Sequence, residues 1–402
     1  MELLKGKTIV VGVTGGIAAY KSCQLVSDLI KEGCEVHVVM TANARNFINP
    51  ITFETLTGNK CLTDTFDRAF QFNVEHVALS QRADLFIIAP ATANIIGKLA
   101  NGIADDMLST MCLAATCDII VAPAMNTYMY TNPVVQDNIE KLRHYGRIII
   151  EPASGRLACG DEGKGKLPDI PVLLGHIKRA VGYNKDCKGL RVLVTAGPTA
   201  EPLDPVRFIT NHSSGKMGYA VAEAAAMRGA DVTLVSGPVS IPAPMFTDTV
   251  RINTASEMFD AVASHLPDCD ILIMAAAVAD YTPTDYSEHK IKKKEGDMFI
   301  PLKRTRDILA YAGQNKREGQ LICGFSMETR DLLENSSKKL EAKHCDMIAA
   351  NSISTEGTGF ASDTNRLTLI THGGVKELDL LSKSGCAHRL LDELLELRRE
   401  CK

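Results

Sequence analysis

Short apolar runs recur along the chain, separated by longer stretches that mix apolar and polar positions. Runs of about four to eight residues predict buried strands, and the longer stretches between them predict helices. Strands that alternate with crossover helices form a parallel sheet covered by helices on both faces. The pattern therefore predicts an α/β protein with mostly parallel sheets. The runs lie at 8–13, 35–40, 85–89, 119–122, 147–151, 191–195, 231–235, 271–276, 321–325, 347–350 and 367–371.

The runs form two series, and each series predicts a doubly wound domain with three layers. Both series open with Lys-Gly and a β-branched strand that ends in Thr-x-Gly, at 5–16 and at 188–197. This internal similarity is weak, because any strand that leads into a helix N-terminus favours such residues. Residues 182–188 form a polar segment between the series, so we expect domains at 1–186 and 187–402.

Composition indicates a globular protein. The 402 residues are 45% hydrophobic with a formal net charge of -4, which is enough apolar material for two or three cores at roughly 150 residues each. Every apolar run is shorter than the roughly 20 residues of a membrane helix, and residues 1–13 lead into a strand instead of a signal peptide. We therefore expect a cytoplasmic protein without a membrane partner. Mild acidity also argues against nucleic acid, which binds to clustered cationic faces.

The 12 cysteines lie at wide intervals, without a C-x-x-C pair or the histidine spacing of a zinc site. The sequence therefore implies neither a disulfide framework nor a structural metal site. We expect most of these cysteines to be small core residues.

A glycine-rich turn follows the first predicted strand, at Thr14, Gly15, Gly16 and Ile17. The turn leads into a helix predicted at 18–31, so its backbone N–H groups should converge where an anion can bind. It does not match G-x-G-x-x-G, which argues against NAD. A tight strand–helix turn without a ligand is the alternative.

The second domain has a comparable anion-binding pattern at 211–218, where serine, glycine and lysine precede an alanine-rich helix. This is not a Walker A loop, because Thr210 stands where that motif has its first glycine and Met217 follows Lys216. A Rossmann-type dehydrogenase is the alternative for this motif.

Two groups of lysines follow predicted strand ends in the second domain. Lysines four positions apart on one helix face can converge on a triphosphate, although an ordinary solvated face is the alternative for the first group. The groups are Lys290, Lys292, Lys293 and Lys294, and then Lys339 and Lys343.

Motifs in both halves resemble known enzyme families. Residues 123–130 and 158–165 resemble the substrate loop and the active-site flap of flavin-dependent phosphopantothenoylcysteine decarboxylases. Residues 211–218, 275–280 and 290–293 resemble motifs of the cytidylate-forming phosphopantothenate-cysteine ligases. The resemblance covers nearly the whole chain. It implies a flavodoxin-like domain followed by a Rossmann-like domain, in a bifunctional bacterial enzyme of coenzyme A synthesis.

The resemblance implies FMN as the cofactor of the first domain. Ligands of open α/β sheets bind at the carboxyl ends of the strands, where the implied contacts lie. For Thr92 or Asn94 taken alone, helix capping is the alternative. The implied FMN contacts are Thr14, Gly15, Gly16, Ile17, Thr41, Thr92, Ala93 and Asn94.

Three residues of the first domain have implied catalytic roles. His76 is the implied general base, although a single histidine is more often structural. Asn126 is implied to donate its amide to the carboxylate that leaves as carbon dioxide. Cys159 lies in a glycine-rich stretch suited to a lid, and its thiol can protonate the enethiolate that decarboxylation forms.

Loss of carbon dioxide from an ordinary cysteine carboxylate leaves an unstabilised carbanion. In the implied cycle FMN first oxidises the carbon next to sulfur to a thioaldehyde that accepts the electron pair, and the reduced flavin then returns the electrons. Two positions differ from the family pattern. Tyr130 replaces a tryptophan, and Lys166 replaces an arginine, which keeps the charge but loses the fork geometry.

In the second domain, the resemblance implies that Asn211 binds the carboxylate of 4'-phosphopantothenate and stabilises its acyl-cytidylate. Lys290 is implied to act when the cysteine amine displaces CMP. Mg²⁺ or Mn²⁺ should accompany CTP, with ligands that the sequence does not identify. Residues 304–307 read Arg-Thr-Arg-Asp where relatives have Lys-x-Pro-Asp, so this loop lacks the rigidity of proline. The implied CTP contacts are Ala276, Asp280, Lys290, Arg306, Asp307, Ile308, Leu309, Phe325, Lys339 and Lys343.

We therefore expect CTP-dependent ligation of 4'-phosphopantothenate with L-cysteine, followed by FMN-dependent decarboxylation to 4'-phosphopantetheine. The family forms trimers through the flavin domain and dimers through the ligase domain, which implies a homo-oligomer, often a dodecamer. One alternative is a flavin decarboxylase of peptide cysteines fused to a nucleotide-binding domain, and another is a non-catalytic flavin-binding regulatory subunit. The ligase motifs argue against the first alternative, and His76 and Cys159 argue against the second.

Overall fold

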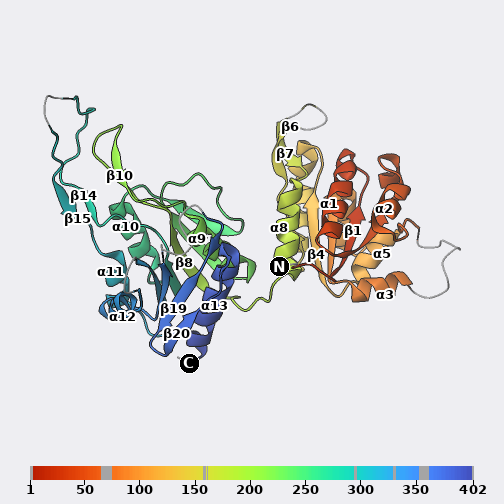
Figure 1. Ribbon diagram of the computed structural model, residues 1–402. Helices are drawn as coiled ribbons and strands as arrows, with labels where there is room; N and C mark the ends of the chain where they lie inside the picture. Colours follow the sequence, from red (N-terminus) through yellow and green to blue (C-terminus); the bar gives the residue numbers. More distant parts are fainter. Residues whose placement is uncertain are drawn as a thin grey trace. The chain divides into compact units, whose positions relative to one another are not determined.

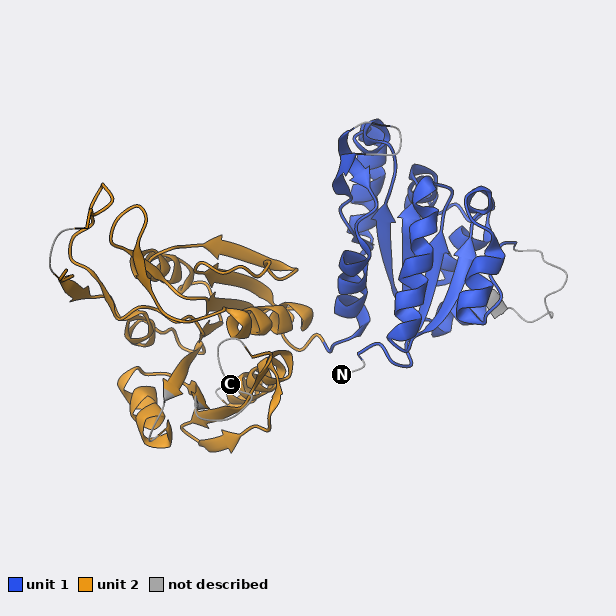
Figure 2. Cartoon of the chain, turned by 45° about the horizontal axis from the view of Figure 1, so that its top comes forward, with its two compact units in different colours: residues 1–184 blue, residues 185–402 orange. Residues whose placement is uncertain are grey.

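The computed structural model describes residues 3–64, 75–156, 160, 162–293, 297–328, 332–352 and 362–400. The chain folds into two compact units, Met1–Asn184 and Lys185–Lys402 (Figure 2). The break between the units falls within the polar segment 182–188.

The first unit is built from a parallel sheet, a small hairpin and helices on both faces of the sheet (Figure 1). Its strands are β1 (Thr8–Val13), β2 (Glu35–Met40), β3 (Leu85–Ala91), β4 (Asp118–Pro123), β5 (Ile148–Ile149), β6 (Ala153–Arg156) and β7 (Glu162–Lys166). Its helices are η1 (Ile17–Tyr20), α1 (Lys21–Lys31), η2 (Ala42–Asn46), α2 (Pro50–Thr57), α3 (Glu75–Arg82), α4 (Ala93–Asn101), α5 (Met107–Ala114), α6 (Thr127–Tyr130), α7 (Pro133–His144) and α8 (Ile170–Val181).

The five-stranded sheet has the order β2-β1-β3-β4-β5, with parallel pairing throughout. Every residue of β1 and β3 is buried, because a separate core covers each face. One core contains Leu25 and Leu29 of α1 and Ile177 of α8. The other contains Ile95 of α4 and Met111 of α5. Apolar residues three and four positions apart thus turn one face of each helix toward the sheet.

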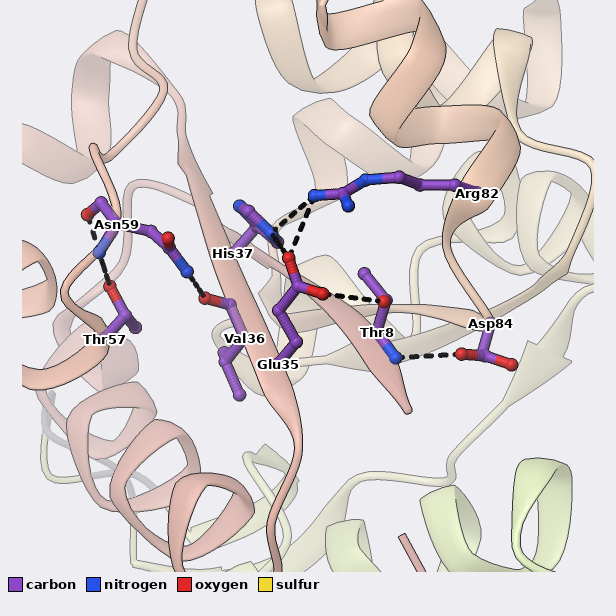
Figure 3. Close-up of polar contacts among 8 residues, drawn as sticks. All are labelled: Thr8, Glu35, Val36, His37, Thr57, Asn59, Arg82 and Asp84. Carbon is purple, nitrogen blue, oxygen red and sulfur yellow. Dashed lines mark hydrogen bonds and ion pairs between the residues drawn. The ribbon is translucent and has the colours of Figure 1, made fainter. Parts of the chain in front are cut away.

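A polar cluster joins the amino-terminal ends of these strands (Figure 3). Asp84 accepts hydrogen bonds from the Thr8 backbone N–H (2.8 Å) and from Lys7 Nζ (2.9 Å). Glu35 accepts from Arg82 Nη2 (2.9 Å) and from His37 Nε2 (2.8 Å) (Figure 3), and the bond from His37 contributes most to lowering the pKa of Glu35 below its ordinary value. Arg82 is the last residue of α3, so this cluster fixes the carboxyl end of that helix against β2.

The second unit contains a large sheet, three short strand pairs and five helices within its described residues (Figure 1). Its strands are β8 (Arg191–Ala196), β9 (Ala200–Pro202), β10 (Phe208–Thr210), β11 (Asp231–Ser236), β12 (Thr247–Arg251), β13 (Ile271–Met274), β14 (Tyr281–Pro283), β15 (Leu302–Arg304), β16 (Leu321–Glu328), β17 (Met347–Ser352), β18 (Thr364–Asn365), β19 (Leu367–Thr371), β20 (Gly374–Glu377) and β21 (Leu381–Ser382). Its helices are α9 (Lys216–Met227), α10 (Ala255–His265), α11 (Ile308–Gln314), α12 (Leu332–Ala342) and α13 (Lys383–Glu400).

The eight-stranded sheet has the order β12-β11-β8-β13-β16-β17-β19-β20, and at one edge β19 pairs antiparallel with both β17 and β20. The other pairs are parallel. A core with Ala222 of α9 and Leu391 of α13 covers one face. A second core, with Met258 of α10, Ala312 of α11 and Leu340 of α12, covers the other. This unit therefore also has three layers.

The predicted fold class is confirmed: both units are α/β folds with mostly parallel sheets. Each apolar run in the sequence corresponds to a strand of one of the two large sheets. The strands β12 and β20 and the short pairs β6–β7, β9–β10, β14–β15 and β18–β21 were not predicted. In the part of the chain that the structure describes, no helix combines the length and apolar character needed to cross a membrane.

Candidate active sites

A cavity of about 1040 Å³ opens at the carboxyl ends of β1 to β4. The strand order reverses between β1 and β3, and ligands of open α/β sheets bind at such a point. Eight predicted site residues line this cavity: Gly15, Gly16, Ile17, Thr41, Thr92, Ala93, Asn94 and Asn126. Sequence reasoning did not assign Lys21, Asn43, Lys98 or Arg156, which line it as well.

The turn after β1 has the features of an anion site. Gly16 is the N-cap of η1 and has no side chain to cap the first N–H groups of the helix, so these groups can bind an anion. A Cβ atom on Gly15 would lie 2.4 Å from Asn43 Cβ, so only glycine lets this turn lie against η2. Around the cavity, Ile17 and Tyr20 are more than half exposed and offer apolar contact to a flat ring. The donor set and the apolar wall therefore fit a flavin with a phosphate tail.

Thr14 lies behind this wall and is only 1% exposed. Its hydroxyl donates to the Pro90 carbonyl (2.7 Å) and accepts from the Thr92 N–H (3.1 Å). The side chain thus ties the turn after β1 to the loop after β3, and both segments line the cavity. We interpret Thr14 as a positioning residue instead of a direct ligand contact.

Replacing Thr14 with valine should lower the stability of the first unit. The substitution leaves the Pro90 carbonyl and the Thr92 N–H without this partner, at a cost of about 1–3 kcal/mol. Thermal unfolding of the two proteins measures the difference. Thr55→Val is the control, because the Thr55 hydroxyl is exposed and bonds only within α2, to the Ile51 carbonyl. An equal loss in both variants would contradict the assignment.

Asn126 is the N-cap of α6, and its Oδ1 accepts from the Tyr128 N–H (2.8 Å). This bond identifies the oxygen end of the side chain, so the nitrogen is the end that can donate to an anion. The next residues along α6 include Met129, which lines the cavity. The local fold therefore presents a donor at the position predicted to hold the departing carboxylate.

The hairpin β6–β7 packs directly on the segment that carries Asn126. Gly165 accepts a backbone hydrogen bond from Met125 (3.0 Å), and a Cβ atom on Gly165 would lie 2.2 Å from the Met125 carbonyl oxygen. On Gly163 a Cβ atom would lie 2.7 Å from Thr127 Oγ1. Two glycines are thus required for the backbone of β7 to approach this closely.

The side chains of two predicted catalytic residues of this unit lie outside the described part of the structure. Cys159 falls in the segment between β6 and β7. His76 is the second residue of α3, and only its backbone is described. Their roles stay predictions.

Tyr130 is the first of the two departures from the family pattern. It is buried, and its hydroxyl donates to Glu151 Oε2 (2.9 Å). Burial and this carboxylate raise the pKa of Tyr130 to about 12, so it is a hydrogen-bond donor at neutral pH. Glu151 also pairs with Lys164 of β7 (3.5 Å), which links α6 to the hairpin. Lys166, the second departure from the family pattern, lines the cavity.

The second unit has two cavities at the carboxyl ends of its parallel strands. One, of about 850 Å³, includes Asn211. The other, of about 640 Å³, is lined by the predicted residues Ala276, Asp280, Arg306, Asp307, Ile308, Leu309, Phe325, Lys339 and Lys343. The segment 275–280 after β13 lies between them, because Asn211 Nδ2 donates to the carbonyls of Ala277 (3.3 Å) and Val278 (3.1 Å).

These two bonds occupy the nitrogen end of the Asn211 side chain. The remaining end is an oxygen, which accepts but does not donate. Asn211 can therefore donate to a substrate carboxylate, as predicted, only if its amide nitrogen gives up its hydrogen bond to one of these two carbonyls.

The lysines of the smaller cavity are held by neighbouring groups. Lys339 Nζ donates to the Phe325 carbonyl (2.8 Å), and Lys343 pairs with Asp307. Burial alone would raise the pKa of Asp307, but Lys343 and the Ala310 N–H hold it below the ordinary value. Asp307 also caps α11. The cavity thus presents two fixed cations from one face of α12 and its following turn.

Arg306 turns away from the lysines and contacts α10. Its Nη2 donates to Asp260 Oδ1 (2.7 Å) and Ser256 Oγ (3.0 Å), and its guanidinium carbon lies 3.7 Å from the centre of the Phe259 ring. The neighbouring Thr305 donates its hydroxyl to the Ala279 carbonyl (2.7 Å). The loop is therefore fixed by side-chain contacts although it lacks the family proline.

Lys290 is exposed and lies on the loop after β14. It is not among the residues that line either of these two cavities. Lys292 and Lys293 are also exposed, and Lys294 is outside the described residues. Within the residues that the structure describes, there is no group of three His, Cys, Asp or Glu side chains that could hold a metal ion.

The first unit matches the family model described as Flavoprotein over residues 2–182. The second matches the model described as DNA/pantothenate metabolism flavoprotein C-terminal domain over residues 187–397. The two units thus define a two-domain flavoprotein of pantothenate metabolism.

Two curated relatives match along the whole chain. The "Coenzyme A biosynthesis bifunctional protein CoaBC" of Bacillus subtilis (strain 168) is 46% identical over 402 residues, which is 99% of this chain and 99% of that protein. The protein of the same name from Escherichia coli (strain K12) is 43% identical over 395 residues, 98% of this chain and 97% of that protein. The chain therefore belongs to the family of coenzyme A biosynthesis bifunctional proteins. A crystal structure of the C-terminal domain of a CoaBC protein is 41% identical, covers 54% of this chain and 100% of that chain, and has a TM-score of 0.47.

The predicted family and bifunctional activity are confirmed: the chain is an enzyme of coenzyme A biosynthesis that combines a decarboxylase with a ligase. A peptidyl-cysteine decarboxylase fused to an unrelated domain and a non-catalytic regulatory subunit are both disfavoured, because the relatives match through both halves.

Proposed function

We propose that the second unit joins 4'-phosphopantothenate to L-cysteine with CTP, and that the first unit decarboxylates the product with FMN to give 4'-phosphopantetheine. The observation that most supports the ligase assignment is the pair of cavities separated by segment 275–280, one with Asn211 and one with Lys339 and Lys343. The decarboxylase assignment is supported by the cavity of the first unit, which lies where the strand order reverses between β1 and β3.

In the first unit, the FMN phosphate would bind the N–H groups that follow Gly16, with the ring against the apolar wall. The flavin supplies a two-electron oxidation and re-reduction, which allows the carboxylate to leave without forming an unstabilised carbanion. Asn126 would donate its amide to that carboxylate. Arg156 and Lys166, at the ends of the two hairpin strands, place positive charge beside the phosphate of the substrate.

The proton transfers of the first unit fall to His76 and Cys159 in this proposal. His76 would act as the general base. Cys159 falls in the sequence between the two hairpin strands, and its thiol would protonate the decarboxylated product.

In the second unit, 4'-phosphopantothenate would bind beside Asn211 and CTP beside Lys339 and Lys343. The substrate carboxylate attacks the α-phosphate of CTP, which forms the acyl-cytidylate and releases pyrophosphate. The amine of cysteine then attacks the acyl carbon and CMP leaves. Lys290 is assigned to this second step. Lys339 and Lys343 would offset the negative charge of the triphosphate.

Removing divalent cations should stop ligation and leave decarboxylation unchanged. We propose that Mg²⁺ or Mn²⁺ enters with the triphosphate, since these ions are commonly bound through substrate phosphates and one or two carboxylates. Asp280 and Asp307 line the nucleotide cavity and can supply the carboxylates. Adding EDTA and then restoring Mg²⁺ in each assay measures the effect. Full ligation in excess EDTA would contradict the proposal.

One experiment tests the whole proposal. Purified enzyme is incubated with CTP, 4'-phosphopantothenate and cysteine, and CMP, pyrophosphate, carbon dioxide and bound flavin are quantified. We expect CMP only when all three substrates are present, and carbon dioxide in equal amount from a yellow protein. CMP release without cysteine, or decarboxylation by protein that carries no flavin, would refute the corresponding half.

We also propose a cytoplasmic homo-oligomer. Ten cysteines within the described residues are free thiols, as expected in a reducing compartment. Exposed apolar side chains gather around the short pairs β9–β10 and β14–β15, among them Val206, Phe208, Phe299 and Leu302, and such surfaces commonly mark interfaces. Light scattering measures the assembly.

A further inference from the structure

Asp204 is a buried carboxylate that the predicted chemistry does not use. It lies in the turn between β9 and β10, and its side chain is fully inaccessible to solvent. Its two oxygens accept five hydrogen bonds, from the Val206 N–H (2.8 Å), the Arg207 N–H (2.8 Å), Arg207 Nε (3.0 Å), Arg207 Nη2 (2.7 Å) and the Ile291 N–H (3.0 Å).

The last of these bonds reaches a different segment, because Ile291 directly follows Lys290. Arg207 Nη2 also donates to the Ile291 carbonyl, so the peptide groups on both sides of Ile291 are held. At the other end of the same loop, the Ser287 N–H donates to the Leu203 carbonyl (3.0 Å). The turn 203–207 thus ties down the segment 287–291 at two points.

The turn also belongs to the substrate cavity. Asp204, Arg207 and Asn211 line the same cavity, and the exposed Lys290 directly precedes Ile291, whose backbone the turn holds. A lysine has a flexible four-carbon side chain, so its ammonium group can act at a defined atom only if its backbone is fixed.

We propose that Asp204 is a positioning residue for the ligase reaction. By holding the backbone at Ile291, it places Lys290 at the cavity that contains Asn211. This inference rests on the proposed role of Lys290 in the cysteine step. It identifies a residue that acts through another residue and does not touch substrate.

An aspartate suits this position for two reasons. Burial alone would raise the pKa of Asp204, but the N–H groups of Ile291, Val206 and Arg207 and the Arg207 guanidinium lower it far below the ordinary value, so the group stays ionised. An asparagine would replace one acceptor oxygen with an NH₂ group, which would face N–H donors.

The test uses Asp204→Asn, Lys290→Gln and the double variant, each as full-length enzyme. CTP and 4'-phosphopantothenate are mixed with enzyme first, and cysteine is added afterwards. We expect Asp204→Asn to form the acyl-cytidylate at a nearly normal rate and to slow its consumption by cysteine about 100-fold, as misplacement of a reacting group does. Because Asp204 acts through Lys290, the double variant should be no slower than Lys290→Gln alone.

The inference would be overturned if the rate losses of the two single variants multiplied in the double variant, or if Asp204→Asn had a normal cysteine step. A normal cysteine step in Lys290→Gln would instead refute the proposed role of Lys290, so the two failures are distinguishable. Asp186→Asn is the matched control, because Asp186 also makes two bonds to an arginine, Arg228, in the same unit (2.8 and 2.6 Å). It should leave the cysteine step unchanged.

A second variant covers the case in which Asp204→Asn does not fold. Ile291→Pro removes the N–H group that donates a hydrogen bond to Asp204, but it leaves the Asp204 carboxylate and Arg207 in place. The residue lies on a loop outside the large sheet, so the fold should persist. We expect accumulation of the acyl-cytidylate in this variant too, and a normal cysteine step would overturn the inference.

Discussion

Replacing Gly165 with alanine should reduce decarboxylation about 100-fold, the cost expected when reacting groups are misplaced by about 1 Å, and should leave ligation unchanged. Gly165 has a φ angle of +145°, which disfavours other residues. The added Cβ atom would also lie 2.2 Å from the Met125 carbonyl oxygen. Because the Cβ position is fixed by the backbone of β7 and the oxygen belongs to the backbone of Met125, β7 must move away from the segment that carries Asn126. Release of carbon dioxide from 4'-phosphopantothenoylcysteine measures the effect.

Gly155 provides the matched control. It lies in β6 opposite Gly163 and has a similar φ angle of +148°, but a Cβ atom there meets nothing within 4 Å. Gly155→Ala therefore introduces backbone strain without the collision. We expect it to keep most of the decarboxylase activity, and similar losses in both variants would show that strain, not docking of the hairpin, controls the reaction.

Changing both Lys339 and Lys343 to glutamine should raise the KM for CTP about 100-fold. A hydrogen bond to a charged group contributes about 1.5–3 kcal/mol, and about 1.4 kcal/mol corresponds to a factor of ten, so each lysine should account for roughly tenfold. The lysines line the nucleotide cavity, whereas cysteine is expected to react on the other side of segment 275–280. The KM for cysteine should therefore change little.

Lys338→Gln is the control on the same helix. Lys338 is exposed and pairs with Glu334 one turn earlier (2.6 Å), so it shares the charge and the helix but not the cavity. Initial rates at varied CTP should give a nearly unchanged KM for this variant. An equal rise in KM would mean that the general positive charge of α12, and not the two cavity lysines, attracts the nucleotide.

The strands of both large sheets were predictable because each buried strand is a continuous apolar run. β12 and β20 were missed because they are the edge strands of the second sheet, and neither contains a fully buried residue or a continuous apolar run. The short pairs were missed for a related reason. β7, for example, contains Gly163 and Gly165 and owes its conformation to contact with the Asn126 segment, which no local pattern reveals.

The predicted site residues come from motifs that place several chemical groups together in the sequence. Arg156, Lys21 and Asn43 lack such a motif and reach the first cavity from three separate elements. Asp204 is similar: its sequence neighbours predict a turn, but its bond to Ile291 joins positions 87 residues apart. The bonds of Asn211 to Ala277 and Val278 also depend on tertiary contact.

We expect Arg306, in the loop before α11, to make the nucleotide side of the enzyme sensitive to ionic strength. Arg306 holds its loop through Asp260 and the Phe259 ring, and both charged partners are about half exposed or more. Dissolved ions screen such contacts, with a Debye length of about 8 Å at 0.15 M salt. A pyrrolidine ring would stiffen the same loop at any salt concentration. In this chain, we instead expect the order of the loop that shapes the nucleotide cavity to depend on the salt concentration.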